Sequence, residues 1–374
     1  MTSVNYKSQL SKNLNQLILS HNLSDKSESL KIGVIYKNTK YKLKWGKDFT
    51  YYDLASLTKP IFTMSAFLVT EEFHKPVIHK SVDNLLPWFR PVLGSNLNSD
   101  LKSMQTTNLN SNLKPKVLNT KNQISISDLL SHQSGARALY PVYQELKNKT
   151  LNGLSPLNEL IRQAPFDQIG PVYSDVGYFY LGSILESLFN KPLYYIFEDL
   201  RSYFDMSDLH FNPLGEKSVY PINKYAPTEN CPLRKKIIQG EVHDENCWKM
   251  GGVGPHAGLF GSMDGVLNWV ENIMNVFSGD SQFSKATVSK FLKKQKGDWR
   301  LGLMVPSKPI SSCGHYFSDS SYGHLGFTGT SFWVDPKKDL AVVILSNRTY
   351  PNRDNKTFNI LRPLIHNAVW ETLK

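Results

Sequence analysis

A serine and a lysine three residues apart, Ser56 and Lys59, are the pair in this sequence best placed to do chemistry. In a helix, side chains at positions i and i+3 share one face with Cβ atoms roughly 5–6 Å apart, so the lysine can reach the hydroxyl. A serine is a poor nucleophile unless a base lies beside it, and burial near a helix N-terminus disfavours a proton on the lysine. The pair predicts covalent catalysis through an acyl-serine, with the amides of the helix start available to an oxyanion.

The residues that follow distinguish this pair from others of the same spacing. Positions 61–69 are apolar almost all round, which is typical of a buried helix. Two other Ser-x-x-Lys tetrads, beginning at Ser99 and Ser111, lie in a polar stretch with no apolar helix after them. Only the first tetrad is therefore expected to belong to a core-anchored site.

Serine hydrolases that use a Ser-x-x-Lys nucleophile need two further short motifs, and candidates for both follow here in the required order. Tyr173 and Asp175 stand on a loop before a predicted helix, and the run His324-Leu325-Gly326 lies in a predicted strand. A tyrosine oxygen near the lysine can relay the serine proton to the leaving group. A donor or cation on the strand can orient the substrate, and glycine lets the acyl chain lie close to the backbone.

The remaining prominent histidines are interpreted as structural. His132 is expected to be packed and hydrogen-bonded, because no base role is vacant. His243, Asp244 and His256 supply too few convergent ligands for a metal site, so no metal and no cofactor are predicted. The second His-x-Gly, at His256, is set aside because it is expected to lead into a helix rather than along a strand.

Composition indicates a globular protein that acts on small substrates. The chain has 374 residues, 40% of them hydrophobic, and 43 basic against 32 acidic residues give a net charge of +11. The basic residues are scattered and no nucleic-acid motif accompanies them, so a small molecule or short peptide is the expected partner rather than nucleic acid. Three cysteines without metal-ligand spacing favour a reducing compartment. With no signal-peptide core and no apolar run of about 18 residues, we expect a cytoplasmic protein without a membrane span.

Hydrophobic periodicity places these motifs on a mixed fold. We expect an amphipathic helix over 8–19, a β-hairpin over 30–45, helices that begin at Ser127, at Ser174 or Asp175 and at Ser262, strands over 300–305, 323–334 and 340–346, and a closing helix over 358–373. This order predicts an α+β fold in which one antiparallel sheet is assembled from both chain ends and flanked by helices, with a mainly helical lobe inserted.

The whole chain, 1–374, is expected to form a single domain. Its sheet lobe would cover about 1–70 and 290–374, and its helical lobe about 71–289. The Asn- and Ser-rich stretch 94–122 is expected to be a long mobile loop. Tyr322 and Trp333, beside His324, could either line the cleft or pack in the sheet.

Several long motifs resemble the β-lactamase-related serine hydrolases, most closely the branch of class C-like penicillin-binding proteins and esterases. The resemblance runs from the first hairpin to the C-terminus. It rests on Asp53-Leu-Ala-Ser-Leu-Thr-Lys, Asp128-Leu-Leu-Ser-His-Gln-Ser-Gly, Tyr173-Ser-Asp-Val-Gly-Tyr, the run 242–260 and Gly323-His-Leu-Gly-Phe-Thr-Gly-Thr-Ser-Phe-Trp.

The resemblance implies a two-lobed fold with the site between sheet and helical lobe. Ser56 would be acylated by an amide or ester carbonyl, with Lys59 and Tyr173 as the base system. The backbone N–H groups of Ser56 and Phe327 would hold the oxyanion. Asp175 and the His324 strand, with Leu325 and Gly326, would contact the substrate.

Two positions depart from the family pattern. Asp175 stands where most members have asparagine, and an ionised carboxylate there would raise the pKa of Lys59 and oppose its action as a base. His324 replaces the more usual lysine and is expected to be only partly charged near pH 7. These departures favour esters or unusual peptides over penicillin-type substrates.

The expected function is a serine hydrolase that acts through an acyl-serine on an ester, an amide or a peptide containing D-amino acids. One alternative is a penicillin-binding DD-peptidase or β-lactamase. Another is a catalytically weak binding or regulatory module on the same fold, because a fold does not guarantee a function.

Overall fold

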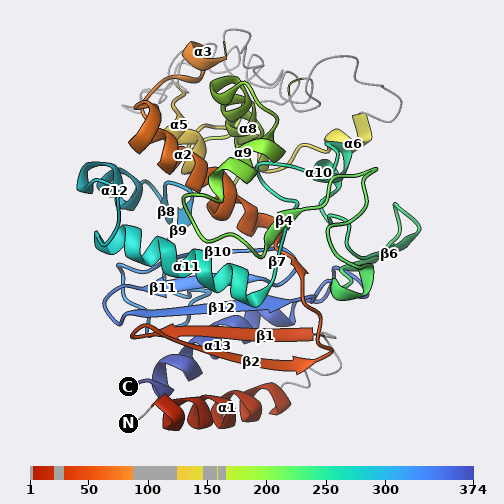
Figure 1. Cartoon of the computed structure of the whole chain (residues 1–374), viewed down its shortest axis with the longest axis vertical. Coiled ribbons are helices and arrows are strands. Elements are labelled where there is room, and N and C mark those ends of the chain that lie inside the picture. The colour runs from red at the N-terminus through yellow and green to blue at the C-terminus, as the bar shows by residue number, and fades with distance from the viewer. Residues whose placement is uncertain (1–2, 21–28, 87–123, 146–157, 159–165) are drawn as a thin grey trace, which may run out of the picture.

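The computed structural model describes residues 3–20, 29–86, 124–145, 158 and 166–374 (Figure 1). The stretch 94–122, predicted to be a loop, lies outside these residues, as do the serines of the two discarded tetrads.

One antiparallel sheet of seven strands, in the order β2-β1-β12-β11-β10-β9-β8, runs from the middle of Figure 1, at β8, down to β2, above α1. The first hairpin lies beside the last strand, with Leu30 opposite Ser346 and Tyr36 opposite Leu340. The predicted α+β fold, with a sheet built from both chain ends, is therefore confirmed. The strands are β1 (Ser29–Tyr36), β2 (Thr39–Gly46), β8 (Trp299–Arg300), β9 (Leu303–Met304), β10 (Tyr322–Leu325), β11 (Ser331–Asp335) and β12 (Leu340–Ser346).

Two of the predicted strands are each divided by a turn. The stretch 300–305 forms part of the β8–β9 hairpin, and Gly302 adopts a φ of 75° between the two strands. The stretch 323–334 forms β10 and β11, and the Gly326 N–H donates to the Thr330 carbonyl across the intervening turn at 2.7 Å. The sequence pattern did not reveal these turns, because a glycine can also occur within a strand, for example at a bulge. The second turn carries Phe327 at the end of β10.

Helices cover both faces of the sheet, which explains its apolar character on both sides. α1 (Ser3–Ser20) and α13 (Thr357–Thr372) pack on one face, where they meet Ile32 and Val34 of β1. α11 (Met263–Ser278) packs on the other face, so closely that a Cβ at Gly33 would meet Met263 at 2.5 Å. The predicted first and last helices are confirmed, as is Ser262 as the cap of α11.

The segment that carries Ser56 differs from the single α-helix that was expected. It begins with a 3₁₀ turn, η2 (Ala55–Leu57), and continues as the π-helix η3 (Lys59–Met64), the α-helix α2 (Ser65–Val69) and the π-helix η4 (Thr70–His74). Although Lys59 lies just beyond the 3₁₀ turn, its amine is 3.1 Å from the Ser56 hydroxyl, so the predicted proximity survives the change. Before this segment, β3 (Tyr52–Asp53) joins a small sheet with β7 (Leu259–Gly261) and β4 (Leu209–Phe211).

Helices of the upper half surround the buried α2 segment (Figure 1). Ser174 caps α8 as predicted, because its hydroxyl accepts the Gly177 N–H. The predicted cap at Ser127 is wrong: Ser125 caps α5 through a capping box with Asp128. The remaining elements are α3 (Val82–Leu85), α5 (Ile126–Leu130), α6 (Val142–Glu145), α8 (Asp175–Phe189), α9 (Leu193–Leu200), η5 (Ile222–Lys224), β5 (Glu229–Cys231), β6 (Lys236–Ile238), α10 (Glu245–Lys249) and α12 (Lys285–Leu292).

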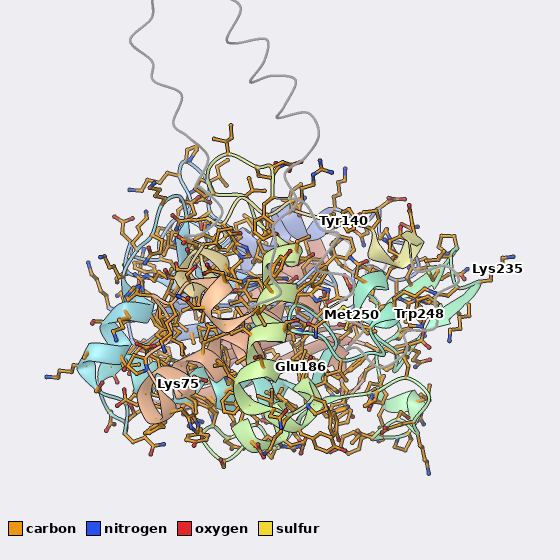
Figure 2. The ribbon with its side chains drawn as sticks, turned by 90° about the horizontal axis from the view of Figure 1, so that it is seen from above. Lys75, Tyr140, Glu186, Lys235, Trp248 and Met250 are labelled. Carbon is orange, nitrogen blue, oxygen red and sulfur yellow. The ribbon has the colours of Figure 1, made fainter. Side chains whose placement is uncertain are left out.

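Figure 2 looks down on this upper half, and in that view Trp248 and Met250 lie between Glu186 of α8 and Lys235 at the tip of the β5–β6 hairpin. The three cysteines are buried and carry free thiols. Among the described helices, none combines the length and the apolar character needed to cross a bilayer.

Candidate active site

Ser56 and Lys59, at the start of the segment 55–64, lie beside Tyr173, which is on the loop just before α8. The Lys59 amine lies 3.1 Å from the Ser56 hydroxyl and 4.9 Å from the centre of the Tyr173 ring. Lys59 is completely buried. The segment 55–64 and the loop before α8 thus bring together a hydroxyl, an amine and a phenol from distant parts of the chain.

Asp175, the first residue of α8, forms an ion pair with Lys59. Their Oδ1 and Nζ atoms are 2.6 Å apart, and 8% of Asp175 is exposed. Burial lowers the pKa of Lys59, but the charge of Asp175 and the polar oxygen of Tyr173 outweigh this effect and raise it above its usual value. The lowered pKa expected from the helix start is therefore not found, and Lys59 is an ammonium at neutral pH. Burial, the largest influence, also raises the pKa of Tyr173 although Lys59 opposes it.

A second segment holds Lys59 from the other side. Its amine lies 3.3 Å from the His256 carbonyl oxygen, and the His256 ring is hydrogen-bonded to Asp244 at 3.0 Å. Asp244 also caps α10 by accepting the Cys247 N–H. His256 leads into the strand β7, so the expectation of a helix directly after it is wrong.

A pocket of about 380 Å³ opens above the Ser56 hydroxyl. Both predicted oxyanion residues, Ser56 and Phe327, line it, and so do Tyr173 and the His324 strand. Ser56 lies in the first turn of its helix, where backbone N–H groups have no helical partner. The full lining is Ser56, Tyr173, Trp299, Met304, His324, Leu325, Gly326, Phe327, Arg348, Asn359 and Arg362.

His324 is buried in the wall of the pocket and carries no charge at neutral pH. Burial, with a contribution from Lys59, lowers its pKa to about 3. Its Nδ1 lies 2.9 Å from the Leu325 carbonyl oxygen, so Nδ1 bears the hydrogen of the neutral ring and Nε2 bears a lone pair. The expectation of a partly charged group is therefore wrong.

The other histidines and aromatic residues behave as structural groups. His132 accepts the Ser174 N–H at 3.0 Å and packs against Tyr173 and Trp299. Trp333 and Tyr322 are buried within the hydrophobic cores and do not line the pocket. No cluster of three or more His, Cys, Asp or Glu side chains suited to a metal occurs in the described residues.

Sequence reasoning missed two arginines that line the pocket. Arg362 is 6% exposed and donates to Ser331 and to the Thr330 carbonyl, while Arg348 lies over the Phe327 ring and donates to backbone carbonyls. Across the part of the chain that is described, neither guanidinium forms an ion pair with a carboxylate. The available signal was a charge on the apolar face of the closing helix, one turn from Phe358 and Ile365.

Known proteins share this architecture. A protein of Escherichia coli O157:H7 with the provisional name D-alanyl-D-alanine carboxypeptidase is 31% identical over 333 residues, which cover 80% of this chain and 70% of that relative. The structure described as "EstCE1, a hydrolase with promiscuous acyltransferase activity" has a TM-score of 0.69 at 18% identity, over 97% of this chain and 99% of its own.

A further structure, described as "A class C beta-lactamase", has a TM-score of 0.65 at 15% identity, over 98% of this chain and 97% of its own. At such identities the structures establish the fold alone. The sequence profile of the Beta-lactamase family matches residues 26–365. The chain therefore belongs to the Beta-lactamase family, and it is a serine hydrolase of that family.

Proposed function

We propose that the protein cleaves an amide or ester by transferring its acyl group to Ser56 and then to water. The observation that carries this proposal is the hydroxyl of Ser56 at the floor of an open pocket, 3.1 Å from the Lys59 amine, with Tyr173 lining the same pocket. A nucleophile with a proton acceptor in contact is the usual arrangement for covalent catalysis.

Tyr173 relays the proton in this scheme. As the Ser56 oxygen bonds to the acyl carbon, its proton passes to the Tyr173 oxygen, and the phenol proton passes to the leaving nitrogen or oxygen as that bond breaks. Water then attacks the acyl-serine, gives a proton to Tyr173, and the phenol proton returns to Ser56. Tyr173 ends each half-reaction neutral, which suits a phenol whose pKa burial has raised.

Lys59 acts as a fixed positive charge rather than as the base. Its ion pair with Asp175 supports this role, because it keeps Lys59 an ammonium. An ammonium 3.1 Å from the Ser56 oxygen stabilises the negative charge that develops as the proton moves. The amides of Ser56 and Phe327 hold the carbonyl oxygen, and loss of one such donor typically lowers the rate by about 10²–10³.

Arg348 and Arg362 favour a substrate that carries a carboxylate. Two guanidinium groups line one wall of the pocket without an acidic partner in the described residues, and a substrate carboxylate would supply it. This feature favours the alternative of a DD-peptidase or β-lactamase more than the sequence did. The charges of Arg348 and Arg362 replace the positive charge that the neutral His324 does not supply.

Intact-protein mass spectrometry tests the proposal. We expect the wild-type protein to gain the mass of one acyl group after incubation with an activated ester or a β-lactam, and Ser56→Ala to gain none. Peptide mapping would place the acyl group on Ser56. A wild-type protein that stays unmodified by a panel of activated esters and by a panel of β-lactams would remove the hydrolase proposal and favour a binding module. Equal labelling of Ser56→Ala would do the same.

A further inference from the structure

His243 lies between the two turns that carry the proposed oxyanion donors. Its backbone N–H donates to Asp53 Oδ2 at 2.7 Å, and the other oxygen of Asp53 accepts the Ala55 N–H at 2.8 Å. Asp53 is 2% exposed. One buried carboxylate thus joins His243 to the residue directly before Ser56.

Ala55 needs this support because its backbone has a φ of 47°. Residues with a Cβ rarely adopt the left-handed region, and they persist there only where the surrounding structure holds them. The direction of the Ser56 amide depends on that turn. Thr328, which follows Phe327, also donates its hydroxyl to the Asp53 carbonyl oxygen at 2.7 Å, so both turns are attached to the same residue.

The ring of His243 supports the second turn. It stacks on the Phe327 ring with centroids 5.6 Å apart and planes 24° apart. On Phe327 the Arg348 guanidinium also rests, 4.8 Å from the ring centroid. Because 47% of Phe327 is exposed, these ring contacts rather than a hydrophobic core hold its side chain.

The imidazole is itself fixed from behind. Its Nε2 donates to Glu229 at 3.1 Å, and Arg353 donates to both oxygens of Glu229. Burial alone would raise the pKa of Glu229, but the hydrogen bonds from Arg353 and His243 lower it to about 2. Glu229 is therefore an anion that only accepts, and the ring orientation of His243 is determined.

We propose that His243 is the positioning residue of the oxyanion hole, holding the Ser56 turn through its backbone and the Phe327 turn through its ring. The proposal rests on the proposed function, because it needs both amides to bind the developing oxyanion. A positioning residue of this kind acts on the transition state, so its loss lowers kcat and leaves KM little changed.

The test compares His243→Ala and His243→Phe with His210→Ala. His210 is an equally buried histidine whose ring bonds Tyr225 and does not line the pocket, so it serves as the matched control. A fluorophosphonate counts the reactive Ser56 in each preparation. Hydrolysis of p-nitrophenyl acetate then gives kcat per reactive site, and inhibition by 3-carboxyphenylboronic acid, whose tetrahedral Ser56 adduct places an oxygen in the hole, gives Ki.

We expect His243→Ala to lower kcat per site about 10–100-fold and to raise the boronic acid Ki by a similar factor, less than the loss of a whole donor. His243→Phe should recover most of the loss, because it keeps a ring against Phe327. His210→Ala should reduce only the number of reactive sites.

If His243→Ala had the wild-type kcat per reactive site and the wild-type Ki, the inference would be overturned and the hydrolase proposal would stay intact. Should His243→Ala not fold, Glu229→Leu decides the matter: it removes the acceptor of the ring N–H and frees the ring, so an unchanged kcat per site would overturn the inference. A wild-type protein that the fluorophosphonate leaves unlabelled would instead overturn the proposed function.

Discussion

The pocket has a floor, formed by Ser56 and Tyr173 above the Lys59–Asp175 ion pair, and a wall that contains Arg348 and Arg362. The positive charge of the floor has an acidic partner in the protein, and that of the wall has none among the described residues. On the floor, the Lys59 ammonium is 2.6 Å from Asp175 and its charge is neutralised within the protein. On the wall, burial and the proximity of Arg348 lower the pKa of Arg362 to about 10, so two cations of like sign still face the pocket at neutral pH. The ammonium of the floor has its acidic partner within the protein, whereas under the proposed function the wall gains one only when an anionic substrate binds.

This difference separates catalysis from specificity. Removing a buried charge from water is costly unless a partner is present, so the unpaired wall lowers stability in the absence of a ligand. The same cost becomes affinity once a carboxylate fills the gap. In the proposed mechanism the ion pair on the floor gains nothing from a substrate carboxylate and acts only on the reacting oxygens.

The largest effect is expected from Tyr173→Phe, which breaks the floor and leaves the wall intact. Loss of the relay oxygen should lower kcat by about 10²–10⁴ with little change in KM. Steady-state hydrolysis of an activated ester measures both constants. Tyr178→Phe is the control, because that phenol is buried nearby and donates to the Leu130 carbonyl outside the pocket. A Tyr173→Phe enzyme within about threefold of the wild type would exclude the relay.

A smaller effect is expected from Arg362→Gln and Arg348→Gln, which break the wall and leave the floor intact. Each change should raise KM for an ester that bears a carboxylate by about 10–100-fold, the usual size of a hydrogen bond to a charged group. The neutral isostere of the same ester should be hydrolysed as before. Equal losses for both esters would show that the arginines support the fold rather than select the substrate.

Local patterns predicted the floor well. The Ser56–Lys59 spacing and the Tyr173–Asp175 loop could each be found within a few residues of sequence, as could the His324 strand, which lies in the wall. Their convergence follows from a sheet that joins both chain ends, which the strand periodicity also indicated. Errors in detail came where equivalent signals compete, as with Ser125 and Ser127, either of which can cap α5.

The wall and its supports could not be predicted in the same way. Arg348 follows a buried strand and Arg362 interrupts an apolar helix face, but only the tertiary structure brings the two together. His243 was judged structural because too few metal ligands accompany it, and its partners in the structure, Asp53 and Phe327, lie 190 and 84 positions away in the sequence. Charges and rings acquire such roles from contacts between distant segments, and periodicity carries no information about them.

The smallest effect at neutral pH is expected from Asp175→Asn, which removes the carboxylate partner of Lys59. The cation of the floor then lacks an acidic partner, as Arg348 and Arg362 do among the described residues. Without the carboxylate, burial is the dominant influence on Lys59 and its pKa should fall below the usual value, whereas in the wild type it is raised. If the ammonium is the working form, activity of the variant should decline as pH rises through that lowered pKa, and the wild type should show no such decline. If neutral Lys59 were the base, the variant would instead gain activity with rising pH. The ratio kcat/KM for an uncharged ester between about pH 6 and pH 10 distinguishes the two signs. Asp167→Asn, which removes a carboxylate paired with Arg137, provides the control and should follow the wild-type profile.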